Sequence, residues 1–86
     1  MILNVCSVFD KKAEAFGRPI FVPAKGLAIR SFIDEVNRED AQNSMYMHPD
    51  DYILYYLGEF DDGDGSFNTE SGHTVLMTGT SAKEVK

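Results

Sequence analysis

Residues 52–60 read YILYYLGEF, the strongest strand pattern in the chain. Aromatic and branched aliphatic residues are typical of strands, and seven of the nine residues belong to these types. Alternation along a strand predicts one face with Tyr52, Leu54, Tyr56 and Phe60, and another with Ile53, Tyr55 and Leu57. Because both faces are apolar, we expect this strand to be central or covered on both sides.

Shorter strands are predicted on either side of this segment. The β-branched, apolar run from Ile2 to Phe9 indicates a buried strand. Residues 10–19 form a loop, and Ile20–Val22, set between two prolines, allows only a brief extended piece at an edge. After an aspartate-rich turn at 61–65, residues 66–68 start the return strand of a hairpin. Residues 73–78 read HTVLMT and predict a last strand, with Val75 and Met77 alternating against Leu76.

One amphipathic helix is predicted at about residues 25–40, where apolar residues recur at helical spacing: Ala28, Ile29, Phe32, Ile33 and Val36. A polar connection follows at 41–51, and we expect the tail from about residue 80 to be flexible. These elements predict an α+β fold, in which a small antiparallel β-sheet of three to five strands is packed by one α-helix.

The length of 86 residues allows a single domain, residues 1–86. A chain this short buries only about 60–65% of its unfolded surface, so we expect a homodimer to supplement its core. The only cysteine, Cys6, cannot form an internal disulfide. No apolar run approaches the roughly 18–20 residues of a membrane helix, and we expect no membrane association.

Charge is distributed unevenly along the chain, whose net charge is −6. Residues 1–30 hold five basic and two acidic residues, a net charge of +3, whereas residues 31–86 hold three basic and twelve acidic residues, a net charge of −9. This asymmetry indicates two surfaces with different partners. A generic nucleic-acid binder is disfavoured by the overall charge, but a local basic patch remains able to bind phosphates.

The sequence offers little for catalysis or metal binding. The DDGDG turn at 61–65 does not fit the EF-hand pattern, and His48 and His73 have no cysteine or glutamate at zinc spacing. Phosphate-binding loops and nucleophile motifs are missing, and Cys6 lies within an apolar strand. We therefore expect no enzyme activity, no metal and no cofactor.

The segment from residue 11 to residue 30 is the candidate binding site, because it interleaves cations with aromatic rings. Single-stranded nucleic acid is held by cations along its phosphates and by rings that stack on its bases. The predicted nucleic-acid-binding residues are Lys11, Lys12, Phe16, Arg18, Phe21, Lys25 and Arg30. The alternative is that Phe21 packs under the helix and the lysines are only solvated. The same two interpretations, a stacking surface or a place in the core, apply to Tyr52, Tyr55 and Tyr56. For these tyrosines a core position is favoured.

Five short motifs resemble a known family. They are SVFDKKA at 7–13, FGRP at 16–19, AIRSF at 28–32, HPDD at 48–51 and LGEFDD at 57–62. In this order they resemble the small nonstructural protein of gokushoviruses, the single-stranded DNA bacteriophages of the microvirus group. The resemblance covers about residues 5–65.

The resemblance implies a protein of the host bacterial cytoplasm that is left out of the mature virion. The family is usually equated with the microvirus C protein, which acts in the switch to single-stranded genome synthesis and packaging. We therefore expect an accessory protein that binds single-stranded DNA during viral genome synthesis or packaging. The alternative is an adaptor without DNA contact, which docks on the replication initiator or the procapsid through its acidic face.

Overall fold

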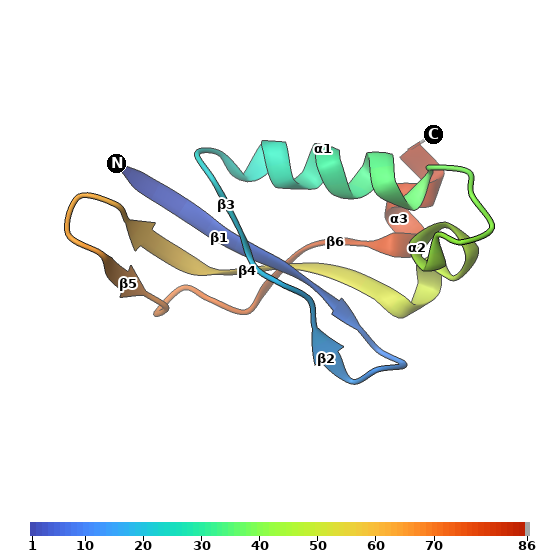
Figure 1. The fold of residues 1–86 in the computed structure, drawn as a ribbon, viewed down its shortest axis with the longest axis horizontal. Helices are drawn as coiled ribbons and strands as arrows, with labels where there is room; N and C mark the ends of the chain where they lie inside the picture. Colours follow the sequence, from blue (N-terminus) through green and yellow to red (C-terminus); the bar gives the residue numbers. More distant parts are fainter. Residues whose placement is uncertain (86) are drawn as a thin grey trace.

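Strand β4 (Tyr52–Asp61) lies at the centre of the sheet in the computed structural model, which describes residues 1–85. It pairs along its whole length with antiparallel β1 (Ile2–Asp10). Two short strands, β2 (Ala15–Phe16) and β3 (Ile20–Val22), continue the sheet beyond β1. On the other side β5 (Ser66–Asn68) and β6 (Thr74–Thr78) pair with β4 (Figure 1). The predicted α+β fold is confirmed. The described residues form six strands instead of the predicted three to five, because each outer row is divided in two and β2 lies within the segment predicted to be a loop.

Helix α1 (Lys25–Val36) covers one face of the sheet, which we call the helix face (Figure 1). Its buried residues Ala28, Phe32 and Val36 form one core cluster with residues of β1, β4 and the C-terminal helix, namely Cys6, Leu54, Tyr56 and Ala82. The spacing of four residues between Ala28, Phe32 and Val36 places all three on the same side of the helix. This is the helix that the apolar periodicity predicted.

Helix α1 ends earlier than predicted, at Val36 instead of about residue 40. Two asparagines satisfy the carbonyls at this end. Asn37 Nδ2 donates to the carbonyl of Ile33 at 2.8 Å and to that of Ala82 at 3.0 Å. The buried Asn43 donates from Nδ2 to the carbonyls of Glu35 and Arg38 at 2.8 and 3.0 Å. These bonds replace the turn that a longer helix would have formed.

Two regions predicted to be irregular contain helices. The polar connection holds the one-turn helix α2 (Ser44–Met47), whose Met45 N–H donates to Asn43 Oδ1, and the 3₁₀ turn η1 (Pro49–Asp51). The expected flexible tail instead forms α3 (Gly79–Val85), in which Ala82 is fully buried against the core. Gly79 lies so close to the Pro49 carbonyl that a side chain would not fit there. No helix of residues 1–85 is long and apolar enough to cross a membrane.

Two β-bulges change the faces that simple alternation predicts. In β4, Tyr56 pairs with Cys6 and Gly58 pairs with Val5, so Leu57 is an extra residue. Beyond this bulge every side chain of β4 changes face. Phe60 therefore points to the other face of the sheet from Tyr56, instead of to the same face. In β6, Leu76 is the extra residue, because Val75 pairs with Tyr55 and Met77 with Leu54. The predictions that Phe60 shares a face with Tyr56, and Val75 with Met77, are therefore wrong.

Candidate functional site

The sheet face opposite α1, which we call the open face, is covered by aromatic rings instead of a helix. It carries Leu3, Val5, Ser7 and Phe9 of β1, together with the residues that pair with them. Val5 and Ser7 are buried at 6% and 2% exposure, although the described helices pack on the other face. Ser7 Oγ donates to the Gly17 carbonyl at 2.7 Å. The aromatic rings on this face fall into two groups within residues 1–85.

The first group, the Phe16 cluster, consists of Phe9, Phe16, Tyr55 and His73. Phe16 pairs with Phe9 across β1 and β2, and their ring centroids lie 4.9 Å apart. The Phe16 ring also lies 5.4 Å from Tyr55 and 6.0 Å from His73, both in edge-on geometry. These contacts fix the orientation of a ring that remains 41% exposed.

The second group, the Phe67 cluster, consists of Phe21, Phe60 and Phe67. The Phe60 ring lies 5.4 Å from Phe21 and 4.7 Å from Phe67, and the rings of Phe21 and Phe67 are 6.4 Å apart. Phe21 is 44% exposed and Phe67 is 61% exposed. Three strands, β3, β4 and β5, each contribute one ring, so the sheet itself brings the cluster together.

Cations gather at the end of the sheet that holds the Phe16 cluster. Lys11 and Lys12 lie in the turn between β1 and β2, and Arg18 follows Phe16 by two residues; all three are exposed. Asp10 Oδ1 accepts from the backbone N–H groups of Lys12 at 2.9 Å and Ala13 at 3.3 Å, which closes this turn. The turn beyond the Phe67 cluster carries Asp62 and Asp64 instead. The open face therefore has a basic end, where the three cations outnumber Asp10 and Glu14 of the same segment. Its other end is acidic, although the N-terminal ammonium pairs with Asp62 there at 2.8 Å.

The seven residues predicted to bind nucleic acid do not form one surface. Phe16 and Phe21 lie on the open face, with Lys11, Lys12 and Arg18 near one end of it. The other two predicted cations, Lys25 and Arg30, belong to α1 on the helix side. Lys25 Nζ lies 4.1 Å from the ring centroid of Tyr56, a core residue with 4% exposure.

Five rings of the two clusters were missed by the sequence reasoning, namely Phe9, Tyr55, Phe60, Phe67 and His73. Phe60 was assigned to the wrong face because the bulge at Leu57 was not recognised. Tyr55 was grouped with its buried neighbours, although alternation alone separates it from Tyr56. Phe67 lies in a three-residue strand too short to show a period. The glycine after Leu57 was the available signal for the bulge, since an isolated glycine within a strand often marks one.

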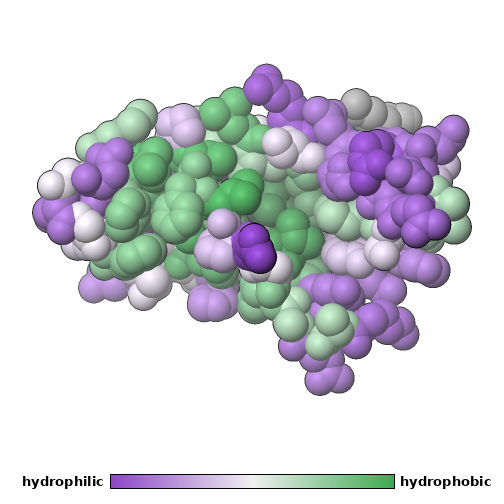
Figure 2. Space-filling model, in the orientation of Figure 1, coloured by the Kyte–Doolittle hydropathy of each residue, from purple (hydrophilic) through white to green (hydrophobic). Residues whose placement is uncertain are grey.

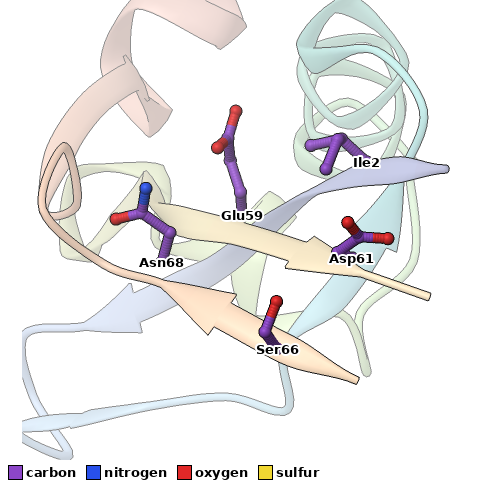
Figure 3. A pocket seen from close by; sticks show the side chains of 5 residues that line it. All are labelled: Ile2, Glu59, Asp61, Ser66 and Asn68. Atoms are coloured by element: carbon purple, nitrogen blue, oxygen red, sulfur yellow. The ribbon is translucent and has the colours of Figure 1, made fainter. Parts of the chain in front are cut away.

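The hollows of the surface are shallow, and they indicate a binding function less clearly than the two aromatic clusters do. One of about 200 Å³ lies on the helix face beside the hairpin of β4 and β5, lined by Ile2, Glu59, Asp61, Ser66 and Asn68 (Figure 3). The residues that the structure describes include no group of three or more His, Cys, Asp or Glu side chains arranged to hold a metal ion. Cys6 is fully buried, and this burial raises the pKa of its thiol, which disfavours a nucleophilic thiolate.

Comparison with known proteins identifies the family. The family model described as Phage ORF5 protein matches residues 3–82. Protein ORF5 of Chlamydia phage 1 is 38% identical over 63 residues, which cover 71% of this chain and 66% of that protein. No solved structure matches the chain. The match with a gokushovirus protein confirms the resemblance found in the sequence, and this chain belongs to the Phage ORF5 protein family.

Proposed function

We propose that this phage protein binds single-stranded DNA on the open face of its sheet, as a non-enzymatic accessory factor. The observation that carries the proposal is the Phe16 ring, exposed yet held in place by Phe9 and Tyr55, next to the cations Lys11, Lys12 and Arg18. An oriented ring beside cations is the combination that single strands require, because bases stack on the ring while cations contact the phosphates.

The aromatic chemistry favours single strands over duplexes. Stacking on a protein ring needs an accessible base face, and each such stack contributes about 1–3 kcal/mol with little dependence on the base. In a duplex the base faces are occupied by neighbouring base pairs, so Phe16 has nothing to stack on. The open face therefore supports binding that discriminates against duplex DNA without reading a sequence.

The cations of the basic end are available for phosphates. Ion pairs within residues 1–85 involve the N-terminal ammonium and Arg38, and none engages Lys11, Lys12 or Arg18. Acidic side chains at the opposite end leave the net charge unfavourable, so the attraction is local and depends strongly on salt. We place this activity in viral genome synthesis or packaging, on the basis of the family resemblance.

Fluorescence anisotropy with a labelled single-stranded oligonucleotide tests this function, at about 50 and 200 mM salt and with a duplex control. We expect binding that weakens with salt, favours the single strand and is lost in a Lys11→Glu, Lys12→Glu variant. The matched control, Lys25→Glu with Arg30→Glu, makes the same change in net charge on the helix side and should retain binding.

A folded protein that binds no single strand at low salt would overturn the proposal. Two other binding partners would then remain as candidates, a second copy of this chain and a viral protein. A second copy on the open face would make the oligomeric state sensitive to Phe16→Ala in sedimentation. A viral partner docked on the acidic end would lose affinity after replacement of Asp62 and Asp64 by asparagine.

A further inference from the structure

We infer that the open face is a site with two stacking positions, in which the Phe67 cluster holds a second base of the same strand that the Phe16 cluster engages. This inference rests on the proposed function and extends it to a part of the chain with no assigned role. The Phe67 cluster lies on the same face as the Phe16 cluster, beside Leu3 and Val5 of β1, whereas Phe16 lies beside Phe9.

Phe67 is poorly explained as a core residue. Its ring is 61% exposed, on a three-residue strand beside a turn rich in aspartate and glycine. The hydrophobic surface shown in Figure 2 gathers over this half of the molecule, while hydrophilic residues dominate the end that holds α2. An apolar side chain gains little stability where it remains mostly in water. A flat ring presented to solvent, with its position fixed by Phe60, is suited to stacking.

The rigidity of the cluster supports a binding role. Phe60 contacts both Phe21 and Phe67, so the three rings restrain one another. Phe60 reaches this face only because of the bulge at Leu57, where the next residue, Gly58, has φ of 138°. A side chain fixed before binding loses less conformational entropy when a ligand arrives.

The register gives the separation of the two clusters. Phe16 lies opposite Phe9, whereas Phe21 and Phe60 lie opposite Val5 and Leu3. Phe67 pairs with Phe60, so Phe16 and Phe67 are six residues apart along β1 and three strands apart across the sheet. At roughly 3.4 Å per residue and 4.8 Å per strand, the two rings are about 25 Å apart. Stacked nucleotides advance about 3.4 Å each along one strand, so this distance corresponds to about seven nucleotides. Shorter oligonucleotides reach only one cluster.

The two ends of the open face differ in charge, so they contribute to DNA binding in different ways. Lys11, Lys12 and Arg18 lie near the Phe16 cluster, and Asp62 and Asp64 lie beyond the Phe67 cluster. Phosphates are attracted at the first end and repelled at the second. The Phe67 cluster must therefore contribute by stacking alone, and its loss should lower affinity without changing the salt dependence.

The experiment measures the affinity of the full chain for oligothymidylates of increasing length. For the wild type we expect a steep rise in affinity up to about seven nucleotides, followed by a shallow increase. Phe67→Ala and Phe67→Leu should each abolish the rise and lower affinity for longer strands at least about fivefold. Phe67→Leu keeps an apolar contact with Phe60 and so separates stacking from packing. Leu27→Ala removes an exposed apolar side chain from α1 and should have no effect.

The results separate this inference from the proposed function. If the wild type binds no oligothymidylate of any length, the proposed function itself fails. If long strands bind and Phe16→Ala weakens them, but the Phe67 variants bind like the wild type, the proposed function stands and the second stacking position is refuted. A changed salt dependence in Phe67→Leu would also contradict the inference that the Phe67 cluster contributes by stacking alone.

Discussion

The rings of Phe21 and Phe60 lie 5.4 Å apart on the open face, at an interplanar angle of 72°. Their strands are not neighbours, since β3 and β4 each pair with β1 on opposite sides. The contact therefore crosses above β1, where Val5 pairs with Phe21 and also with Gly58. The bulge before Gly58 turns Phe60 toward Phe21, so one backbone irregularity creates the Phe67 cluster.

Gly58→Ala should destabilise the protein by about 1–3 kcal/mol. Gly58 has φ of 138°, and an added Cβ would clash with the carbonyl oxygen of Asn68, so the backbone would have to move. Urea unfolding measures the loss. Gly26→Ala is the control, because space is open around Gly26 in α1, and alanine there should stabilise by up to about 1 kcal/mol. Equal stabilities for the two variants would show that the bulge tolerates a side chain.

Asn43→Ala should cost about 1–3 kcal/mol, because it removes a buried amide that donates to two carbonyls at the end of α1 and accepts from the first turn of α2. Thermal unfolding followed by circular dichroism checks this loss. Gln42→Ala, one residue away and exposed, should be nearly neutral. Similar effects for both variants would mean that the Asn43 bonds contribute little.

The stability of an Arg38→Gln variant should depend on pH in a defined direction. Arg38 donates to both carboxylate oxygens of Glu35 at 2.8 Å, which lowers the pKa of Glu35 below its usual 4.5. This contribution is fully present above the unfolded-state pKa and disappears as pH falls through the lowered folded-state pKa. The wild type should therefore unfold at a higher temperature than Arg38→Gln near about pH 7, and the difference should disappear as pH falls below 4.5 and Glu35 becomes protonated. A constant difference over this range would exclude the ion pair as its cause.

The salt dependence of DNA binding counts the phosphates that the basic end contacts. Three cations imply a slope of about −2 for the logarithm of the binding constant against the logarithm of salt concentration, at roughly −0.7 per phosphate. Arg18→Gln should reduce this slope by about 0.7, whereas Arg30→Gln, on the helix side, should leave it unchanged. A reduced slope in Arg30→Gln would mean that the DNA strand contacts the helix side, which would contradict its proposed position on the open face.

The sheet centre and the helix could be predicted because their patterns are long and regular. Alternation predicted the faces of β4 as far as Tyr56, and the spacing of Ala28, Phe32 and Val36 predicted the buried side of α1. The bulges at Leu57 and Leu76 could not be predicted from alternation, because one extra residue leaves composition unchanged while exchanging the faces. Helix α3 was missed because its burial depends on small residues, Gly79 and Ala82, that carry little apolar signal.

The candidate site was predicted in part for the same reasons. A single segment of the chain contains Phe16, Phe21 and the cations, and proximity in sequence suggested one surface. The structure shows that the segment crosses from the sheet to the helix, which separates Lys25 and Arg30 from the rings. Partners from distant strands, such as Tyr55 and Phe67, become visible only through strand pairing.

Mapping the aromatic resonances by NMR during titration with a single-stranded oligonucleotide tests the central claim most directly. We expect shifts for the rings of Phe16, Tyr55 and Phe67 on the open face, with Phe32 and Tyr56 in the helix-face core unchanged. Shifts confined to α1 and the helix face, or none at saturating oligonucleotide, would contradict the claim that the aromatic face binds DNA.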